Sequence, residues 1–195
     1  MRPISLTSVF AKVAEDFVCS CVTSDIQPSL DARQYGNVKG ASTSHYLVRL
    51  VHDLCSAAKR SRNVGTVVLT DFTKAFVNDL IKHNILVQKV ISCGVCESIV
   101  PWICDFLCGR EQCVRFKNKL SRNITLNAGI PQGTTFSGVG FQIMINDAVM
   151  NSKSLALKYV DDLSIYENRH IDQTDDIPKQ VNKCLCLADF YTHLP

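Results

Sequence analysis

Two adjacent aspartates, Asp161 and Asp162, stand between two short apolar runs and restrict the local fold more than any other feature of the chain. The runs Ala156–Val160 and Leu163–Ile165 are rich in apolar, β-branched and aromatic residues, which is typical of strands. Aspartates favour turns, so the sequence predicts a β-hairpin with two carboxylates at its tip. Neighbouring carboxylates repel each other unless a cation lies beside them, and carboxylate oxygens suit Mg²⁺. An Asp-Asp pair alone is more often a solvated turn, so the magnesium hypothesis depends on the rest of the chain.

The composition is typical of a globular protein. The chain has 195 residues, of which 46% are apolar and 20% charged, so it can bury the core of one domain. A formal net charge of +3 permits a polyanionic partner without requiring one. No apolar run is long enough to span a membrane, and residues 1–6 lack the hydrophobic region of a signal peptide. We therefore expect an intracellular protein, in the cytoplasm or the nucleus.

Ten cysteines are many for a chain of this kind. The pair Cys93 and Cys96, followed by Cys104 and Cys108, raises the alternative of a zinc site. The second pair has the wrong spacing and falls in a helix-like stretch, so we expect buried free thiols instead.

Two helices are predicted in the first third of the chain. Apolar residues at a spacing of four indicate a helix over residues 4–22, capped by Thr7 or Ser8 and followed by a polar connector over residues 23–33. A glycine-punctuated segment, 34–44, leads to a second helix capped by Ser42 or Thr43. The residues expected to share an apolar helix face are Val9, Val13 and Phe17 in the first helix and Leu47, Leu50, Val51 and Leu54 in the second.

A third carboxylate follows a buried strand. Residues 66–70 are apolar and β-rich, and Asp71 comes at their end, before a helix-like segment that runs through Val90. A strand that delivers an acid at its end can place a metal ligand on a rigid element. The structural alternative is an aspartate that caps the following helix.

The middle and end of the chain alternate short elements. We expect a helix over Glu97–Leu107, then short strands at Gln112–Phe116 and Ile124–Leu126 that flank a basic polar stretch. The loop 128–137 contains a Pro-Gln-Gly turn, which exposes backbone amides near a helix start. Two further helices are expected, over residues 136–150 and Pro178–Tyr191.

The three carboxylates converge if the strand ending in Asp71 pairs beside the Asp161-Asp162 hairpin. Such a cluster can hold two Mg²⁺ ions, or Mn²⁺ as an alternative, about 3.5–4 Å apart. That arrangement stabilises both the attacking and the leaving oxygen in phosphoryl transfer, where neutralising charge is the main work of the protein.

The ordered set of motifs resembles the fingers-and-palm part of a reverse transcriptase from a non-LTR, jockey-like retrotransposon. The resemblance covers nearly the whole chain in the right order. The stretches that carry it are Arg2–Leu6, Gln34–Thr43, Asp71–Phe76, Trp102–Gln112, Gly129–Ser137 with Phe141 and Ile145–Asp147, and Tyr159–Asp162.

The resemblance implies a role for each matching residue. Asp71, Asp161 and Asp162 would be the catalytic metal ligands, with the Phe72 carbonyl beside them. Phe76 would lie under the incoming sugar and select deoxynucleotides by a clash with a 2′-hydroxyl. The remaining substrate-binding candidates are Gln132 and Gly133 near the incoming nucleotide, and Lys39 and Arg2 near its triphosphate.

The sequence also departs from the family pattern. Val77 stands where another acid is usual, and Gly138 where a proline is usual; Val139-Gly140 and Asn37-Val38 are unusual too. Glycines at 138 and 140 are expected to loosen a helix start by up to about 1 kcal/mol each. The resemblance further implies that the thumb of a polymerase is missing from the chain.

These observations predict an α/β (α+β) fold. We expect a small antiparallel palm sheet backed by helices of residues 77–93, 97–107 and 137–150, with residues 1–62 as a partial fingers region and residues 63–195 as the palm. The expected function is an RNA-directed DNA polymerase that uses an RNA template, a DNA primer and dNTPs. The alternative is a catalytically inactive, truncated retroelement remnant with at most nucleic-acid binding. An RNA-copying RNA polymerase fits less well, because Phe76 would exclude the 2′-hydroxyl.

Overall fold

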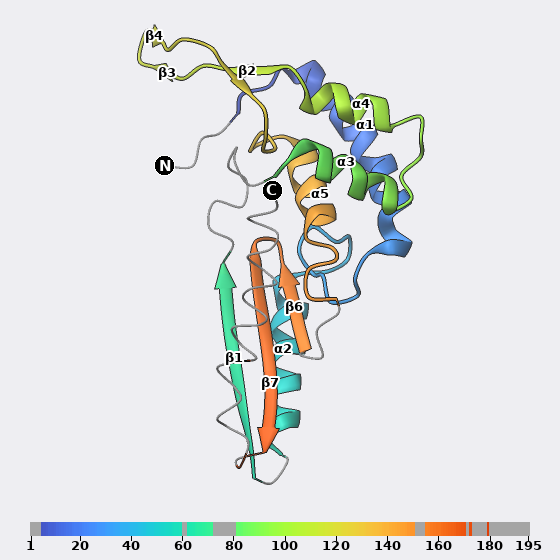
Figure 1. Cartoon of the computed structure of the whole chain (residues 1–195), viewed down its shortest axis with the longest axis vertical. Helices are drawn as coiled ribbons and strands as arrows, with labels where there is room; N and C mark the ends of the chain where they lie inside the picture. Colours follow the sequence, from blue (N-terminus) through green and yellow to red (C-terminus); the bar gives the residue numbers. More distant parts are fainter. Residues whose placement is uncertain are drawn as a thin grey trace. The chain divides into compact units, whose positions relative to one another are not determined.

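A computed structural model describes residues 5–59, 62–71, 81–150, 155–170, 172 and 179, except the side chains of Asp71 and Arg169 (Figure 1). Two compact units alternate along the chain. The first unit combines Met1–Leu30 with Lys74–Met144, and the second combines Asp31–Thr73 with Ile145–Pro195. Both contain helices and antiparallel strands, which confirms the predicted fold class. The division into fingers and palm at residue 62 stays a prediction.

The second unit contains a three-stranded antiparallel sheet in the order β1-β7-β6. Its strands are β1 (Asn63–Asp71), β6 (Leu155–Tyr159) and β7 (Asp162–His170). These are the three strands expected for the palm sheet, and β7 is longer than predicted. Val68 packs against the buried side chains of Ala156, Leu163 and Ile165, which form the core on one face of the sheet with Val149.

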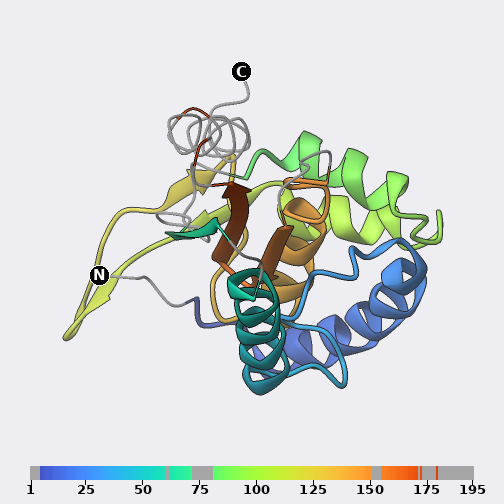
Figure 2. The same ribbon diagram turned by 90° about the horizontal axis from the view of Figure 1, so that it is seen from below.

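Helix α2 (Thr43–Ala58) contacts β1 and β6 of this sheet (Figure 2). Ser42 caps the helix, as predicted, by accepting a hydrogen bond from the His45 amide at 3.3 Å. Tyr46 is buried, and its hydroxyl forms a hydrogen bond with the Ser164 hydroxyl on β7. The predicted apolar face is only partly right, because Leu47 and Val51 are half exposed. Whether the three helices expected behind the sheet lie there stays a prediction.

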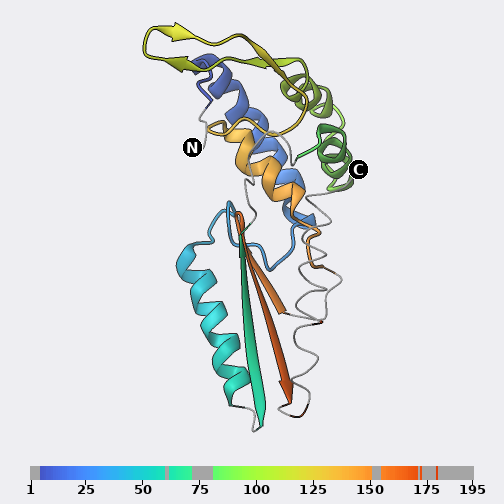
Figure 3. The ribbon, with the colours of Figure 1, turned by 60° about the vertical axis from the view of Figure 1, so that its left-hand side comes forward.

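In its described residues the first unit has four α-helices, which pack in the pairs α1–α5, α3–α4 and α3–α5 (Figure 3). They are α1 (Val9–Ile26), α3 (His83–Ser92), α4 (Val100–Leu107) and α5 (Thr135–Met144), with a 3-10 turn, η1 (Gln27–Ser29), after α1. The predicted connector over residues 23–33 is therefore partly helical. Ser8 caps α1 by accepting from the Ala11 amide at 3.1 Å.

Helix α1 buries a different face from the one that its apolar spacing predicted. Val9, Val13 and Phe17 are exposed, whereas Glu15, Cys19, Val22 and Ile26 are buried. The reason lies at the start of α5, where the first amides of the helix lack partners within it. The Glu15 carboxylate accepts from the Thr135 amide at 3.0 Å, and Asp16 accepts from the Thr135 hydroxyl at 2.7 Å. Glu15 thus caps α5, which turns its face of α1 inward, whereas Asp16 stays exposed beside the Thr135 side chain.

A twisted hairpin connects α4 to the loop before α5. Its inner ladder pairs β2 (Arg110–Gln112) with β5 (Ile124–Leu126), and its outer ladder pairs β3 (Arg115–Phe116) with β4 (Lys119–Leu120). The strand predicted at Ile124–Leu126 is β5, whereas the one predicted at Gln112–Phe116 is divided between the end of β2 and β3, and β4 lies within the predicted basic stretch.

Two expectations for the second half of the chain have other outcomes. Helix α5 ends at Met144, six residues before the predicted end, and residues 145–150 form turns. The predicted helix Pro178–Tyr191 lies outside the described residues apart from Lys179. In the described part of the chain, no helix is both long and apolar enough to cross a membrane.

Candidate active site

The candidate site lies at one end of the β1-β7-β6 sheet. Strands β6 and β7 are joined by a two-residue turn, Val160-Asp161, between the paired residues Tyr159 and Asp162. The register of β1 against β7 places Asp71 directly opposite Asp162. Directly opposite residues in antiparallel strands have Cα atoms about 4.5–5.5 Å apart. The backbone positions of all three aspartates therefore meet at one sheet end.

This donor set suits a divalent cation. Asp161 is half-buried and Asp162 is exposed, so solvent reaches both carboxylates. Carboxylate oxygens are the ligands that Mg²⁺ prefers. Among described side chains, there is no cluster of three or more histidines, cysteines or acids that could hold a metal ion, and the Asp71 side chain is outside that set. The fit to Mg²⁺ thus depends on the backbone register and on the type of donor.

The turn itself has an unusual backbone. Val160 has a φ of +53°, a left-handed conformation that β-branched residues rarely adopt. Residues in such conformations persist only where the surrounding structure holds them, and they concentrate at functional sites. We therefore expect other segments of the chain to hold the tip of the β6–β7 hairpin in this conformation.

The segment 33–36, whose last three residues begin the Gln34–Thr43 motif, supplies part of that support. The Lys158 amide donates to the Arg33 carbonyl at 2.9 Å, and the Tyr35 amide donates to the Lys158 carbonyl at 2.8 Å. Gly36 follows, and a Cβ there would collide with the Val160 backbone nitrogen and would lie 2.6 Å from Val160 Cγ2 and 3.0 Å from the Tyr159 carbonyl carbon. Only glycine allows this segment to lie so close to the hairpin tip.

A buried lysine ties the same hairpin to a second segment. Lys158 is 1% exposed, and its Nζ donates to the carbonyls of Ile145, Asn146 and Ala148 at 3.2, 2.6 and 3.1 Å. The Asp31 carboxylate lies 2.8 Å from the same Nζ. These three carbonyls belong to the turns that follow α5. Buried charges need such partners.

Opposing effects act on the two charged groups. Burial would raise the pKa of Asp31, but the hydrogen bonds from Arg33 and Lys158 outweigh it and lower that pKa to about 2. Burial lowers the pKa of Lys158 from its usual value, and the nearby Asp31 only partly offsets this. Arg33 also donates to both Asp31 oxygens, at 3.0 Å from Nε and 2.9 Å from Nη2. Asp31 is thus the shared anion of two cations.

Two tyrosines outside the hairpin, Tyr35 and Tyr46, form a cluster with Tyr159 of β6. The Tyr46 ring lies 6.0 Å from that of Tyr35 and 5.6 Å from that of Tyr159. The Tyr159 hydroxyl is 2.8 Å from the Thr43 hydroxyl at the start of α2. The hairpin is therefore supported by α2 as well as by the segment 33–36.

The other predicted site residues are spread over the chain. Lys39 is exposed on a turn in the second unit. Gln132 and Gly133 are in the loop before α5, in the first unit; the Gln132 carbonyl accepts from the Ser5 amide at 2.7 Å, and Gly133 has a φ of +97°. Each unit is described by itself, so the roles of these residues stay predictions. Arg2, Phe72, Phe76 and Val77 lie outside the described residues.

Gly140, one of the departures from the family pattern, is explained by packing. A Cβ there would lie 2.7 Å from Ile130 Cδ1 and 3.3 Å from Phe136 Cε1. Both neighbours are fully buried, so neither moves without disturbing the core. The glycine therefore lets α5 pack closely on the Pro-Gln-Gly loop, in addition to any loosening of the helix.

Sequence reasoning missed Lys158 and Asp31. A signal was present, because Lys158 interrupts an apolar run that was itself predicted to be a strand. A lysine in a buried strand requires acceptors nearby. The sequence did not reveal which acceptors, since Asp31 and residues 145–148 approach only in the folded chain.

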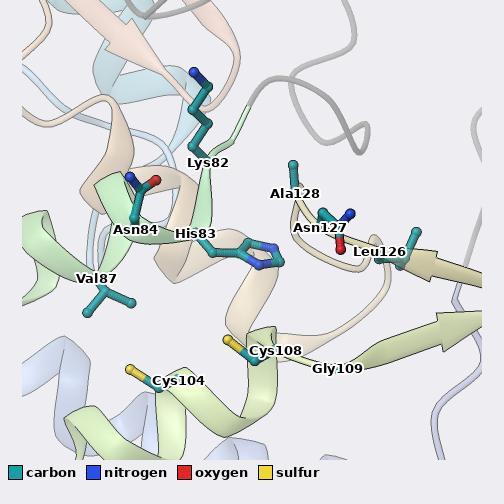
Figure 4. Close-up of a pocket in the computed structure, with 10 residues that line it drawn as sticks. All are labelled: Lys82, His83, Asn84, Val87, Cys104, Cys108, Gly109, Leu126, Asn127 and Ala128. Atoms are coloured by element: carbon teal, nitrogen blue, oxygen red, sulfur yellow. The ribbon is translucent and has the colours of Figure 1, made fainter. Parts of the chain in front are cut away.

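A cavity of about 870 Å³ lies elsewhere, in the first unit (Figure 4). The His83 ring points into it, and His83 Nε2 is 2.8 Å from the Gly129 carbonyl. Its described lining contains no acid, which makes it a poor site for Mg²⁺. The residues that line it are Lys82, His83, Asn84, Val87, Cys104, Cys108, Gly109, Leu126, Asn127 and Ala128.

Comparison with known proteins agrees with this architecture. The family model described as "Reverse transcriptase (RNA-dependent DNA polymerase)" matches residues 1–192. No curated protein sequence matches the chain.

Two solved structures of telomerase from Candida tropicalis have a similar fold. The first, in complex with a TWJ fragment of telomeric RNA, has a TM-score of 0.65 and 14% identity, over 94% of this chain and 32% of the telomerase chain. The second, an apo form truncated from the C-terminal domain, has a TM-score of 0.62 and 14% identity, over 92% and 38%. At this identity the likeness shows the fold alone. The chain spans about a third of the length of these telomerase chains.

Proposed function

The chain belongs to the reverse transcriptase family, and from this premise we propose that it forms the fingers-and-palm part of an RNA-directed DNA polymerase. The observation that carries the proposal is the register that sets Asp71 opposite Asp162, with Asp161 in the adjoining turn. A one-residue slip of β1 against β7 would move Asp71 away from Asp162. The Thr70 hydroxyl, which donates to the Leu163 carbonyl at 3.0 Å, helps to fix this register beside the acids.

In this proposal Asp71, Asp161 and Asp162 hold two Mg²⁺ ions, or Mn²⁺. When bound, the ions supply activation of the primer 3′-hydroxyl and neutralisation of the triphosphate. The protein positions these ligands. Asp161 and Asp162 are adjacent at the tip of the β6–β7 hairpin, and Asp71 is at the end of β1, opposite Asp162. Because phosphoryl transfer depends on orientation and charge stabilisation, two acids on paired strands and a third in the adjoining turn suffice for the metal-binding part of the site.

The remaining roles follow from the family resemblance. Phe76 would exclude ribonucleotides by a clash at the 2′-hydroxyl. Gln132 and Gly133 would contact the incoming nucleotide, and the Phe72 carbonyl would be a further metal ligand. Lys39 and Arg2 would contact the triphosphate.

We further propose that the chain comes from a non-LTR, jockey-like retrotransposon, and that its partners are an RNA template, a DNA primer and dNTPs. The motif order supports the first point. The second is supported by the family and by the RNA fragment bound in one of the similar telomerase structures.

Primer extension on an RNA template with Mg²⁺ tests the proposal. We expect the unmodified chain to add dNTPs and Asp161→Asn to lose at least about 100-fold of that rate, since it removes charge that the metals require. Asp172→Asn is the matched control, because it removes an exposed carboxylate whose neighbours are His170 Nδ1 at 3.0 Å and Arg62 at 3.8 Å. RNA binding without any extension by the unmodified chain would favour the alternative of an inactive remnant.

A further inference from the structure

The outer part of the hairpin between α4 and α5, residues 113–125, carries an exposed positive charge that the proposed catalysis does not use. All thirteen residues are exposed. The segment contains Arg115, Lys117, Lys119 and Arg122 and no acid. Taking these four charges from the chain's net charge of +3 leaves −1 for the rest, so this basic hairpin accounts for the basic character of the whole chain.

Ion pairs within the described part of the chain do not neutralise this charge. In the described part of the chain, none of the four basic side chains pairs with a carboxylate. Glu111, an acid at the base of the hairpin, instead accepts a hydrogen bond from the neutral Asn123 side chain at 2.9 Å. Concentrated like charges repel one another, and a polyanion relieves that repulsion. The basic hairpin is therefore a surface suited to phosphates.

The hairpin is ordered by its own backbone. The Ser121 amide donates to the Val114 carbonyl at 2.9 Å, and the Val114 amide donates to the Ser121 hydroxyl at 2.9 Å. These bonds join the two ladders, and a tight turn at Lys117, with a φ of +53°, closes the tip. Figures 1 and 2 show the tip of the basic hairpin extending away from α1, α4 and α5 of the same unit.

Each face of the basic hairpin combines an apolar and a basic side chain. Phe116 pairs opposite Lys119, and Arg115 pairs opposite Leu120, and directly opposite residues share a face. Phe116 is 71% exposed, and Lys117 Nζ lies 5.6 Å from its ring centre. A bilayer surface favours an element whose apolar and basic side chains lie on separate faces. The basic hairpin has both kinds of side chain on each face. An exposed ring among cations is the arrangement that stacks an unpaired base while the cations contact its phosphates.

We propose that the basic hairpin binds single-stranded nucleic acid, with Phe116 stacking on a base and the four basic side chains contacting the backbone. This inference rests on the proposed function, in which an unpaired template strand approaches the enzyme. The hairpin adds a contact surface separate from the three aspartates.

Salt-dependent binding tests the proposal. Anisotropy of a labelled unpaired RNA about 20 nucleotides long, and of a DNA of the same sequence, measures Kd. We compare the full chain with the fourfold variant Arg115→Gln, Lys117→Gln, Lys119→Gln and Arg122→Gln from about 50 to 200 mM salt. The slope of log K against log salt should become shallower by about 3, since each lost contact to a single strand removes about 0.7.

The matched control removes the same charge elsewhere, through glutamine at Lys12, Arg49, Lys59 and Arg62, which are all exposed. Its slope should stay within about 1 of the unmodified chain. Equal slopes for the two fourfold variants, or no measurable binding by the unmodified chain at low salt, would overturn the proposal. Phe116→Ala should weaken binding by about 5- to 100-fold, and Phe116→Trp should restore it. Equal losses in Phe116→Ala and Phe116→Trp would exclude stacking.

Two further readouts separate the alternatives. Circular dichroism and thermal melting of each variant establish that it folds. Binding to vesicles of phosphatidylserine and phosphatidylcholine that depends on the hairpin, with RNA binding unchanged, would overturn the proposal in favour of a membrane surface. Asp161→Asn should abolish primer extension and keep the salt slope. Failure of the hairpin variant to change RNA binding while the chain extends primers would remove this inference alone.

Discussion

Lys158 and Asp31 show how single residues can set the geometry around a proposed active site. The Lys158 ammonium holds the carbonyls of residues 145–148 and the carboxylate of Asp31. Lys158 is next to Tyr159 of the motif, so a change in this network reaches the aspartates through one strand. Removing one partner of a buried ion pair leaves an uncompensated charge and is strongly destabilising.

We therefore predict that Asp31→Asn lowers the free energy of unfolding by about 3–5 kcal/mol at neutral pH. The double variant Asp31→Asn with Lys158→Met should lose less than Asp31→Asn alone, because no unpaired buried cation remains. Urea unfolding of the unmodified, single and double variants measures the coupling. Additive losses would show that the two charges do not depend on each other.

The same pair predicts a pH dependence. The folded pKa of Asp31, about 2, is below its ordinary value of 3.8, so the ionised form is favoured in the folded chain. Its contribution is fully present above about pH 4 and is lost as the pH falls toward 2, by about 2 kcal/mol in total. In Asp31→Asn the free energy of unfolding should depend less on pH over that window. In Asp172→Asn, which removes an exposed acid, its dependence on pH should stay as in the unmodified chain. An unchanged acid profile in Asp31→Asn would contradict the assignment.

At the scale of the elements, sequence pattern predicted which elements exist better than it predicted their faces and ends. The strands around the Asp-Asp pair were predictable because their residues are β-formers on both sides of a turn. Helix α1 was predicted, but its buried face was not, since Glu15 turns inward to cap α5. The end of α5 was also missed, and the carbonyls that follow it accept hydrogen bonds from Lys158, which lies on a separate strand. Tertiary partners decided each case, and local spacing cannot reveal them.

The hairpin β6–β7 and the segment 33–36 act as one element, and Gly36 is where they touch. Gly36→Ala should lower the free energy of unfolding by about 3 kcal/mol, because the methyl meets backbone atoms of Tyr159 and Val160 that cannot rotate away. Gly65→Ala on β1 is the matched control: its methyl would meet only the Tyr166 ring, at 3.2 Å. Equal losses in the two variants, measured by urea unfolding, would show that the close approach at Gly36 does not hold the hairpin.

For the whole molecule, the order of motifs was more informative than any single motif. An Asp-Asp turn, a strand ending in an acid and a Pro-Gln-Gly loop are each common, but their sequence along the chain indicated the family that the full-length comparison then showed. The sheet that joins Asp71 to Asp162 was predictable for the same reason. The interleaving of the two units was not, because it depends on contacts between stretches far apart in the sequence.

Mg²⁺ binding should therefore be visible as a stability change of the whole chain. A ligand that binds only the folded state stabilises it by about 1.4 kcal/mol at ten times its Kd. For a chain of this size that corresponds to a rise in melting temperature of about 3–6 °C. Asp71→Asn, Asp161→Asn and Asp162→Asn should each lose the rise, because each removes a proposed ligand, whereas Asp172→Asn should keep it.

Without Mg²⁺, one of these variants should melt at a higher temperature than the unmodified chain. Like charges on directly opposite strand residues destabilise a sheet, so Asp162→Asn should raise the melting temperature in a chelating buffer by relieving repulsion from Asp71. Melting temperatures measured with and without Mg²⁺ thus report both the repulsion between Asp71 and Asp162 and its neutralisation by the metal. An equal response to Mg²⁺ in the unmodified chain and in all three aspartate variants would show that the metal binds elsewhere, and the proposed polymerase site would then lack its cofactor.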